Sequence, residues 1–395
     1  MNEESALKKI AIIGASGFVG THFYELIHGS GRDEAIPVIH SSGSAWRLIR
    51  GGAPLVSANL LSKEEIAKAI KGCTHVVNCS RGDDQVMLKG LVNLLEVCAD
   101  SKIQGLVHLS SVMVYGDPPS ANSITEEGTS QPHLSEYGML KFKQDEIVAK
   151  AAKNVPSVIL CPPNITGPYS PYFTGLVNAI QNEEFALMGD GSAPCVVVDV
   201  DNLCHAIYQA LDYCSSSPQR LFITDDELST WSMIIEPLME LAGVSELNSI
   251  TEAELRVLRD NLNRPVKSSF FQSLKHLVSS DVRKAIRKDP MLAKIDIMAR
   301  KSVSLVGYRV EDKLRSSIAG HPPVPKLPQD TPLNVGLTAQ QLRGVRHTCE
   351  KAKNTIGYVP TRSFKQSMDA FSRWYRRHNG LDSDYWPLLK MLGNV

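Results

Sequence analysis

Short apolar runs alternate with amphipathic stretches along the first two-thirds of the 395-residue chain. The runs have the length of buried strands, whereas the stretches between them carry apolar residues at helical spacing. Strands are expected at residues 9–13, 36–39, 53–56, 74–78, 106–109, 157–160, 196–198 and 221–224, and helices at 19–27, 63–70 and 86–99. This order predicts an α/β fold with a doubly wound parallel sheet, because right-handed crossovers place helices on both faces.

A glycine-rich loop joins the first expected strand to the first helix. It reads Gly14-Ala15-Ser16-Gly17-Phe18-Val19-Gly20. Gly14 permits a tight turn, Gly17 lets the backbone approach a pyrophosphate, and Gly20 lets helix and strand pack closely. The helix N-terminus adds free N–H groups and a partial positive charge. The loop therefore predicts a Rossmann-type dinucleotide site, with contacts from Gly14, Ser16, Gly17, Phe18, Val19 and Gly20.

The residues after the second strand bear on which dinucleotide binds. The chain reads Ile39-His40-Ser41 there, with Arg47 shortly after and no Asp or Glu. A carboxylate would bind the ribose hydroxyls of NAD, whereas hydroxyls and a guanidinium suit the 2′-phosphate of NADP. We expect NADP or NAD, with NADP slightly favoured and contacts from His40, Ser41 and Arg47. The alternative is that His40 and Arg47 are solvated loop residues.

Tyr137 and Lys141 stand four residues apart and share one face of an expected helix. An ammonium near a phenol lowers the pKa of the phenol, so that Tyr137 could act as acid or base nearer neutrality. The pair alone is common and usually marks a surface helix. Upstream, residues 109–116 read LSSVMVYG at the end of an expected strand. Ligands of open α/β sheets bind at the carboxyl ends of strands, so these residues are candidates for one site.

These motifs are similar to those of the extended short-chain dehydrogenases/reductases. That superfamily contains nucleotide-sugar epimerases, dehydratases and reductases, 3β-hydroxysteroid dehydrogenases and dihydroflavonol-type reductases. The matching stretches are GASGFVG at 14–20, SSVMVYG at 110–116, YGMLK at 137–141, PPNITGP at 162–168 and GDGSAPCVVVDVDN at 189–202. The similarity runs from about residue 8 to 245 and resumes at 356–360. It implies a smaller, partly helical substrate domain beside the dinucleotide-binding core.

The resemblance also implies roles for single residues. Ser111 would bind the substrate oxygen, Tyr137 would transfer the proton, and Lys141 would hold the nicotinamide ribose and tune Tyr137. The remaining implied contacts are Asn59 to adenine, Asn78, Cys79, Ser80 and Pro162 along the cofactor groove, and Val112, Met113 and Asn164 to substrate.

Two departures from the superfamily pattern narrow the chemistry. Dehydratases carry Asp-Glu after the catalytic Ser or Thr, whereas Val112 and Met113 stand here and transfer no proton. Nucleotide-sugar enzymes usually clamp the diphosphate with an Arg where this chain has Cys195, and Cys161 also stands where many relatives have Arg. Dehydration is therefore disfavoured, and the pocket is expected to be more apolar and to bind nucleoside diphosphates weakly, unless Arg256 or Arg264 supplies the clamp.

The domain organisation follows from where the strand signals fade. We expect a dinucleotide-binding core at 1–165, with further strands of its sheet near 196–200 and 221–224. Residues 166–395 would form mainly the substrate domain, with a basic helical insert at about 250–320 and a Pro-rich loop at 321–333. Apolar residues between Phe270 and Ile286 follow helical spacing. They predict a packed surface helix, or alternatively a basic helix that touches a membrane surface or helps bind an anionic substrate.

Composition excludes several other classes. Lys+Arg and Asp+Glu number 42 each, which argues against a nucleic-acid binder. No apolar run is long enough to span a membrane, and the polar N-terminus is unlike a signal peptide, so a cytoplasmic location is expected. The eight Cys form no CxxC pair and the His show no metal spacing. We expect no metal, and Asp199 and Asp201 to cap a helix.

The sequence thus predicts an NAD(P)-dependent oxidoreductase that acts on a secondary alcohol or ketone through Ser111, Tyr137 and Lys141. One alternative is a nucleotide-sugar epimerase with retained NAD. A second is a non-catalytic dinucleotide-binding protein. A homodimer is expected, because superfamily members often pair through the helix that carries the Tyr–Lys motif.

Overall fold

The computed structural model describes residues 7–127, 135–262 and 333–381. The strands are β1 (Lys9–Ile13), β2 (Glu34–Ile39), β3 (Val56–Ser57), β4 (His75–Asn78), β5 (Gly105–Leu109), β6 (Ser157–Cys161), β7 (Asn164–Thr166), β8 (Leu187–Met188), β9 (Val197–Asp199), β10 (Arg220–Phe222) and β11 (Ser249–Ile250). The α-helices are α1 (Phe18–Ser30), α2 (Trp46–Arg50), α3 (Lys63–Ala69), α4 (Leu91–Asp100), α5 (Glu136–Ala151), α6 (Pro171–Gln181), α7 (Val200–Ala210), α8 (Trp231–Ala242), α9 (Glu252–Leu262), α14 (Val335–Thr338), α15 (Glu350–Ile356) and α16 (Phe364–His378). Shorter turns of helix are η1 (Ser42–Ser44), the π-helical η2 (Gln85–Gly90), η3 (Val112–Tyr115), η4 (Leu211–Tyr213) and η6 (Ala339–Leu342).

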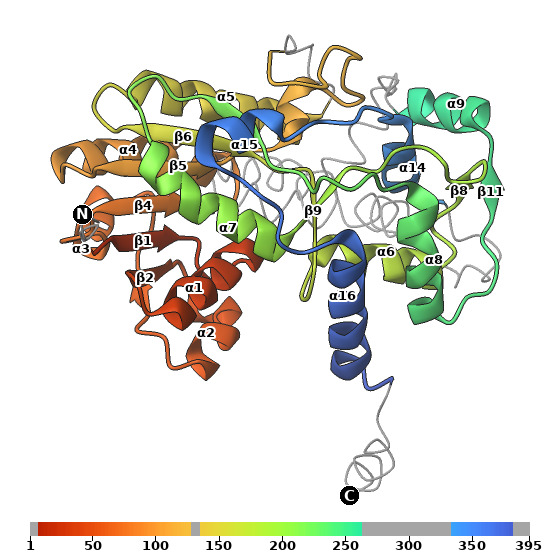
Figure 1. Cartoon of the computed structure of the whole chain (residues 1–395), viewed down its shortest axis with the longest axis horizontal. Helices are drawn as coiled ribbons and strands as arrows, with labels where there is room; N and C mark the ends of the chain where they lie inside the picture. The colour runs from red at the N-terminus through yellow and green to blue at the C-terminus, as the bar shows by residue number, and fades with distance from the viewer. Residues whose placement is uncertain (1–6, 128–134, 263–332, 382–395) are drawn as a thin grey trace, which may run out of the picture. The chain divides into compact units, whose positions relative to one another are not determined.

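A parallel sheet of seven strands forms the centre of the larger part of the chain (Figure 1). Its strand order is β10-β6-β5-β4-β1-β2-β3, so the direction of winding reverses between β1 and β4. Ligands of open α/β sheets bind at this reversal, beyond the carboxyl ends of the strands. The predicted doubly wound sheet is confirmed.

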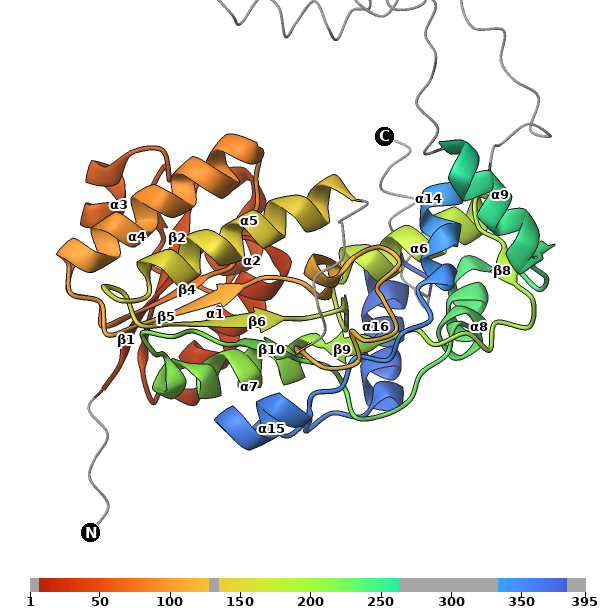
Figure 2. The same ribbon diagram turned by 90° about the horizontal axis from the view of Figure 1, so that it is seen from above.

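The side chains of each central strand alternate between the two faces of the sheet, and helices cover both faces. Ile10 and Ile12 of β1 point into one apolar core with residues of α1, α7 and α15. Ala11 and Ile13 point into a second core with residues of α3, α4 and α5. Successive side chains of a strand face opposite sides, so a strand buried on both sides is a continuous apolar run. Figure 2 shows the two helical layers on either side of the sheet.

The expected strand at 196–200 does not join this sheet. β9 pairs instead with β7 in a separate parallel pair, with Thr166 opposite Asp199. Pro162 and Pro163 follow β6, and proline lacks the N–H that would continue the ladder. The chain therefore leaves the main sheet there and starts a second pair of strands. β10 does join the main sheet, as expected for residues 221–224.

A third apolar core forms the smaller lobe, from α6, α8 and α16. Phe364, Met368 and Phe371 recur at helical spacing and are buried in this core. Their helix α16 begins with a capping box at Ser363 and Gln366 and continues to His378. Segments that are far apart in the sequence therefore build this lobe together.

The chain divides into two compact units, residues 1–256 with 333–395, and residues 257–332. The basic stretch from Phe270 to Ile286, Arg264 and the Pro-rich loop at 321–332 lie outside the described residues. Within the described ranges, no helix has the length and apolar character needed to cross a membrane.

Candidate active site

A cavity of about 740 Å³ lies beyond the carboxyl ends of β1, β4, β5 and β6. One side is formed by Gly17, Phe18, Val19 and Gly20 of the glycine loop. Other lining residues come from the smaller lobe and from the segment before α15. The predicted residues that line it are Gly17, Phe18, Val19, Gly20, Cys79, Ser80, Ser111, Val112, Met113, Tyr137, Lys141, Pro162 and Asn164.

The glycine loop has the backbone that a diphosphate cradle requires. Gly14 has a φ of +79°, a conformation that other residues rarely adopt. A Cβ on Gly20 would lie 2.4 Å from the carbonyl oxygen of Gly14, so only glycine allows α1 to start so close to the loop. α1 begins after Gly17 with no side-chain cap, which leaves its first N–H groups open to a ligand. The loop therefore fits a dinucleotide pyrophosphate.

Two short elements bring Ser111 and Tyr137 together. Ser111 caps η3, and its Oγ accepts a hydrogen bond of 3.2 Å from the Met113 N–H. Ser135 caps α5, and its Oγ accepts one of 3.0 Å from the Gly138 N–H. A Cβ on Gly138 would lie 2.6 Å from the Met113 carbonyl oxygen, so α5 packs directly on η3. The side chains of Ser111 and Tyr137 therefore line the same cavity, and Ser111 is one of the groups that lower the pKa of Tyr137.

Lys141 lies one helical turn further along α5 and is buried. Its Nζ donates a hydrogen bond of 2.8 Å to the Leu109 carbonyl oxygen at the end of β5. Burial lowers the pKa of Lys141 to about 8, and the charge of Asp145 opposes that shift. The ammonium group thus stands at the carboxyl end of the central strands, where a cofactor ribose would lie.

The ionisation of Tyr137 differs from the sequence expectation. Burial raises the pKa of Tyr137, and the main opposing influences are Arg81 and Ser111. The Arg81 guanidinium lies 5.2 Å from the centre of the Tyr137 ring. The expected lowering by Lys141 is not observed, because desolvation of the phenol dominates. Tyr137 therefore holds its proton at neutral pH.

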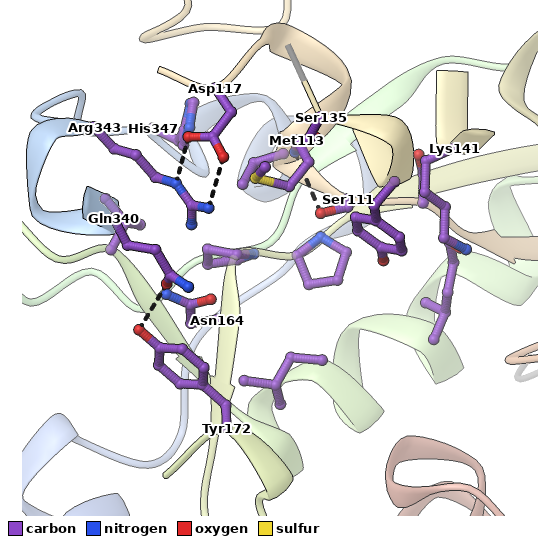
Figure 3. A pocket seen from close by; sticks show the side chains of 18 of the residues that line it. Ser111, Met113, Asp117, Ser135, Lys141, Asn164, Tyr172, Gln340, Arg343 and His347 are labelled. Atoms are coloured by element: carbon purple, nitrogen blue, oxygen red, sulfur yellow. Dashed lines mark hydrogen bonds and ion pairs between the residues drawn. The ribbon is translucent and has the colours of Figure 1, made fainter. Parts of the chain in front are cut away.

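Several residues that line the cavity belong to no recognisable sequence motif. Asp117 accepts hydrogen bonds of 2.9 and 3.1 Å from Nε and Nη2 of Arg343. The hydroxyl of Tyr172 donates one of 3.0 Å to Oε1 of Gln340 (Figure 3). Arg343 also acts on the buried thiol of Cys195 and lowers its pKa against the larger effect of burial. A cation therefore stands near the place where Cys195 replaces the arginine of nucleotide-sugar enzymes.

Arg256 and Arg81 differ in whether they line the cavity. Arg256, one of the two arginines expected to replace the clamp, pairs with Glu252 on α9 and does not line the cavity. Arg81, which belongs to none of the predicted motifs, does line the cavity. Among the described residues, Arg81 forms no ion pair. The charge for an anionic ligand would thus come from Arg81 or Arg343.

The other predicted cofactor contacts lie outside the cavity lining. His40 and Ser41 are exposed after β2. Arg47 pairs with Glu25 at 2.6 Å, and its guanidinium lies 3.8 Å from the centre of the Tyr169 ring.

Three polar residues that were predicted to contact the cofactor form hydrogen bonds within the protein. Ser16 accepts a hydrogen bond from Ser44 at 3.1 Å, and Asn59 accepts one from the Leu61 N–H at 2.9 Å. Asn78 is buried and accepts hydrogen bonds from the hydroxyl and the N–H of Ser80. These interactions stabilise the loops around the glycine loop and β4.

Asp199 caps α7, and its Oδ1 accepts a hydrogen bond of 2.8 Å from the Asp201 N–H. In the part of the chain that the structure describes, no group of three His, Cys, Asp or Glu side chains could hold a metal ion.

Known proteins resemble this chain in sequence and in fold. Sterol-4-alpha-carboxylate 3-dehydrogenase, decarboxylating, of Mus musculus is 24% identical over 253 residues, which are 59% of this chain and 68% of that protein. UDP-glucose 4-epimerase of Caenorhabditis elegans is 26% identical over 176 residues, which are 37% of this chain and half of that protein.

Two crystal structures illustrate the shared fold. UDP-glucuronic acid 4-epimerase of Bacillus cereus, in complex with NAD, has a TM-score of 0.60 at 17% identity over 94% of this chain and 99% of its own. dTDP-glucose 4,6-dehydratase of Bacillus anthracis str. Ames, also with NAD, has a TM-score of 0.63 at 17% identity over 94% and 98%.

The family model for NAD-dependent epimerases and dehydratases matches residues 10–223. This range includes the glycine loop, Ser111, Tyr137 and Lys141, and the whole seven-stranded sheet except the first residue of β1. The expected similarity to the extended short-chain dehydrogenases/reductases is therefore confirmed, and the chain belongs to the NAD-dependent epimerase/dehydratase family.

Proposed function

We propose that this protein is an NAD(P)-dependent oxidoreductase that interconverts a secondary alcohol and a ketone. The observation that carries the proposal is that Ser111, Tyr137 and Lys141 line one cavity together with the glycine loop. A cofactor on that loop and a substrate at these hydroxyls would share one enclosed space. Such proximity is what a transfer between two bound molecules requires.

Each residue of the centre has one task in this reaction. A bound nicotinamide would supply or accept the hydride. Ser111 donates a hydrogen bond to the substrate oxygen and holds it beside Tyr137. Tyr137 gives its proton to that oxygen during ketone reduction and takes it back during alcohol oxidation. Lys141 holds the ribose hydroxyls and adds positive charge near the phenol.

The cofactor is proposed to be NAD before NADP. The family is NAD-dependent, and the two similar crystal structures hold NAD. Arg47, the side chain expected to bind a 2′-phosphate, is held between Glu25 and the ring of Tyr169. No carboxylate follows β2, so the chain retains a weak feature of NADP enzymes.

The substrate is proposed to be largely apolar and without a diphosphate. Asp117 neutralises Arg343 through two hydrogen bonds, which leaves little net charge on that side of the cavity. Met113, Pro194 and Trp231 also line the cavity. A mouse relative is named a sterol-4-alpha-carboxylate 3-dehydrogenase, which supports a substrate with a large apolar part.

A nucleotide-sugar epimerase is the second candidate, and Arg343 is the observation that favours it. Arg343 lies near Cys195 and could bind a diphosphate if its pairing with Asp117 were broken. A relative in Caenorhabditis elegans and several structural neighbours are epimerases. Bound NAD would then be regenerated in every cycle.

One experiment separates the two candidates. The purified full chain would be analysed by mass spectrometry for co-purified ligands and then assayed with NAD and secondary alcohols, including a 3-hydroxysteroid. Net formation of NADH with an alcohol would support the oxidoreductase. Interconversion of UDP-sugars without net NADH would overturn it in favour of the epimerase.

The predicted homodimer and cytoplasmic location remain predictions.

A further inference from the structure

Tyr137, Lys141 and Asp145 follow one another at intervals of four residues on one face of α5. Side chains with this spacing are neighbours along a helix. The Asp145 side chain is fully buried, and its charge is the main influence that favours the protonated form of Lys141. A carboxylate therefore lies behind the lysine of the proposed active centre, on the side away from the cavity.

Arg220 of β10 keeps this carboxylate ionised. Its Nε donates a hydrogen bond of 2.6 Å to Oδ2 of Asp145. Burial raises the pKa of Asp145, and Arg220 is the first influence that opposes this. An ionised carboxylate in the interior needs such a partner, because burial otherwise favours its neutral form.

The second oxygen of Asp145 faces His108. Nε2 of His108 lies 3.9 Å from Oδ1 of Asp145, and neither atom has a hydrogen-bond partner among the described residues. Burial lowers the pKa of His108 far below its usual value, so the ring is neutral. Oδ1 of Asn78 is taken by Ser80, so the Asn78 amide donates to Nδ1 of His108 at 3.1 Å. Nε2 then carries the hydrogen and points to the carboxylate.

The other titratable groups around Lys141 oppose its charge or are neutral. Arg81, from the loop after β4, repels the ammonium. Cys161 is buried and Cys79 is half-buried; desolvation raises the pKa of Cys79 to about 12 and that of Cys161 well above its usual value. Both thiols are neutral at physiological pH. Tyr137 keeps its proton as well, so Asp145 is the full negative charge among these groups.

We propose that Asp145 is a positioning residue that keeps Lys141 protonated, and that Arg220 maintains the charge that Asp145 needs for this task. The inference rests on the proposed function in one respect, which is that Lys141 holds the cofactor. Without Asp145, the ammonium would retain the Leu109 carbonyl as its described partner and would still be repelled by Arg81. Such a lysine loses its proton at lower pH.

Loss of the Asp145 charge is expected to move the pH dependence of NAD binding to lower pH. The pKa of Lys141 is about 8 with Asp145 present. Binding of NAD through a protonated Lys141 is therefore present below this pH and is lost as the pH rises through it. Removing the charge of Asp145 lowers that pKa, so the loss of binding begins at lower pH. At pH 6 the variant would bind NAD almost as the wild type does, and at pH 8 it would bind much more weakly.

The test replaces Asp145 with Asn in the full chain and follows Lys141 directly. An amine-reactive label is applied over a range of pH, and the Lys141 peptide is quantified by mass spectrometry. The midpoint of labelling is expected to fall by about one pH unit or more in Asp145→Asn. NAD affinity, titrated over the same range, is expected to decline at correspondingly lower pH. Glu146→Gln is the matched control, since it removes the same charge from an exposed position on α5.

Asp145→Asn leaves the half-buried Arg220 without its partner, which could prevent folding. The double variant Asp145→Asn with Arg220→Gln removes both charges, and the same direction of shift is expected because Asp145, and not Arg220, is among the charges that act on Lys141. An unchanged Lys141 midpoint in the folded single or double variant would overturn the inference. A lower midpoint with an unchanged pH dependence of NAD binding would support it and would instead remove Lys141 from the proposed cofactor site.

Discussion

Tyr137 is a phenol whose surroundings favour the protonated form. The ring is half-buried, and desolvation outweighs the effects of Arg81 and Ser111 on its pKa. A phenol in this state is ready to donate to a ketone oxygen. In the direction of alcohol oxidation it must first lose its proton, which a bound cationic nicotinamide would favour.

Replacing Tyr137 with Phe is expected to reduce turnover by about a hundred- to ten-thousand-fold, because the transferable proton is lost. NAD affinity should stay nearly unchanged, as measured by fluorescence titration. Tyr115→Phe is the control. It removes a buried hydroxyl that donates to the Glu126 carbonyl and does not line the cavity, so turnover should be retained. Turnover near the wild-type rate in Tyr137→Phe would exclude this residue from the mechanism.

Glu25 is expected to limit the binding of NADP by holding Arg47. In Glu25→Gln, the freed guanidinium could reach a 2′-phosphate, and the affinity for NADPH relative to NADH should rise up to about fivefold, the range of an exposed ion pair. Titrating both cofactors would measure the ratio. Glu34→Gln, which breaks the ion pair with Lys9, serves as the control. An unchanged ratio would show that Arg47 takes no part in cofactor choice.

At the scale of elements, the contact of α5 with η3 creates the candidate centre. The spacing of Tyr137 and Lys141 places both residues on one face of a helix, but it does not predict which element packs against that face. The absence of a side chain at Gly138 lets α5 approach the Met113 carbonyl, and this approach sets Tyr137 beside Ser111. The candidate site thus depends on one glycine that carries no chemistry of its own.

Gly138→Ala is expected to destabilise the protein by about 1–3 kcal/mol and to abolish turnover, because the new Cβ forces α5 away from η3. Urea unfolding and the turnover assay would measure both effects. Gly175→Ala in α6 is the matched control, since no atom lies within 4 Å of its added Cβ. That variant should be as stable as the wild type or slightly more stable. Equal stability of the two variants would contradict the packing argument.

At the scale of the whole molecule, residues far apart in the sequence complete the cavity. Asp117 follows η3, and Arg343 stands between η6 and α15, 226 residues later. Their ion pair joins the segment that follows β5, a central strand, to a late part of the chain. Because it neutralises Arg343, it also decides whether that side of the cavity attracts anions.

The wild-type protein is expected to bind UDP weakly or not at all, whereas Asp117→Asn should bind it measurably. The freed Arg343 would contact the diphosphate, and added salt should weaken this binding because it screens charge. Calorimetric titration at low and high ionic strength would measure it, with Arg256→Ala as the control outside the cavity. Micromolar binding of UDP by the wild type that disappears in Arg343→Ala would move the epimerase to first place.

Sequence patterns alone predicted the layered sheet, the glycine loop and the helical spacing of Tyr137 and Lys141. Each of these depends on local periodicity or on the conformational needs of a few adjacent residues. The folded structure was needed to show that Asp117 neutralises Arg343, that Glu25 holds Arg47, that β9 pairs with β7, and that Tyr137 keeps its proton. Ion pairs, strand partners and desolvation depend on which distant segments meet, and no spacing within one segment encodes that meeting.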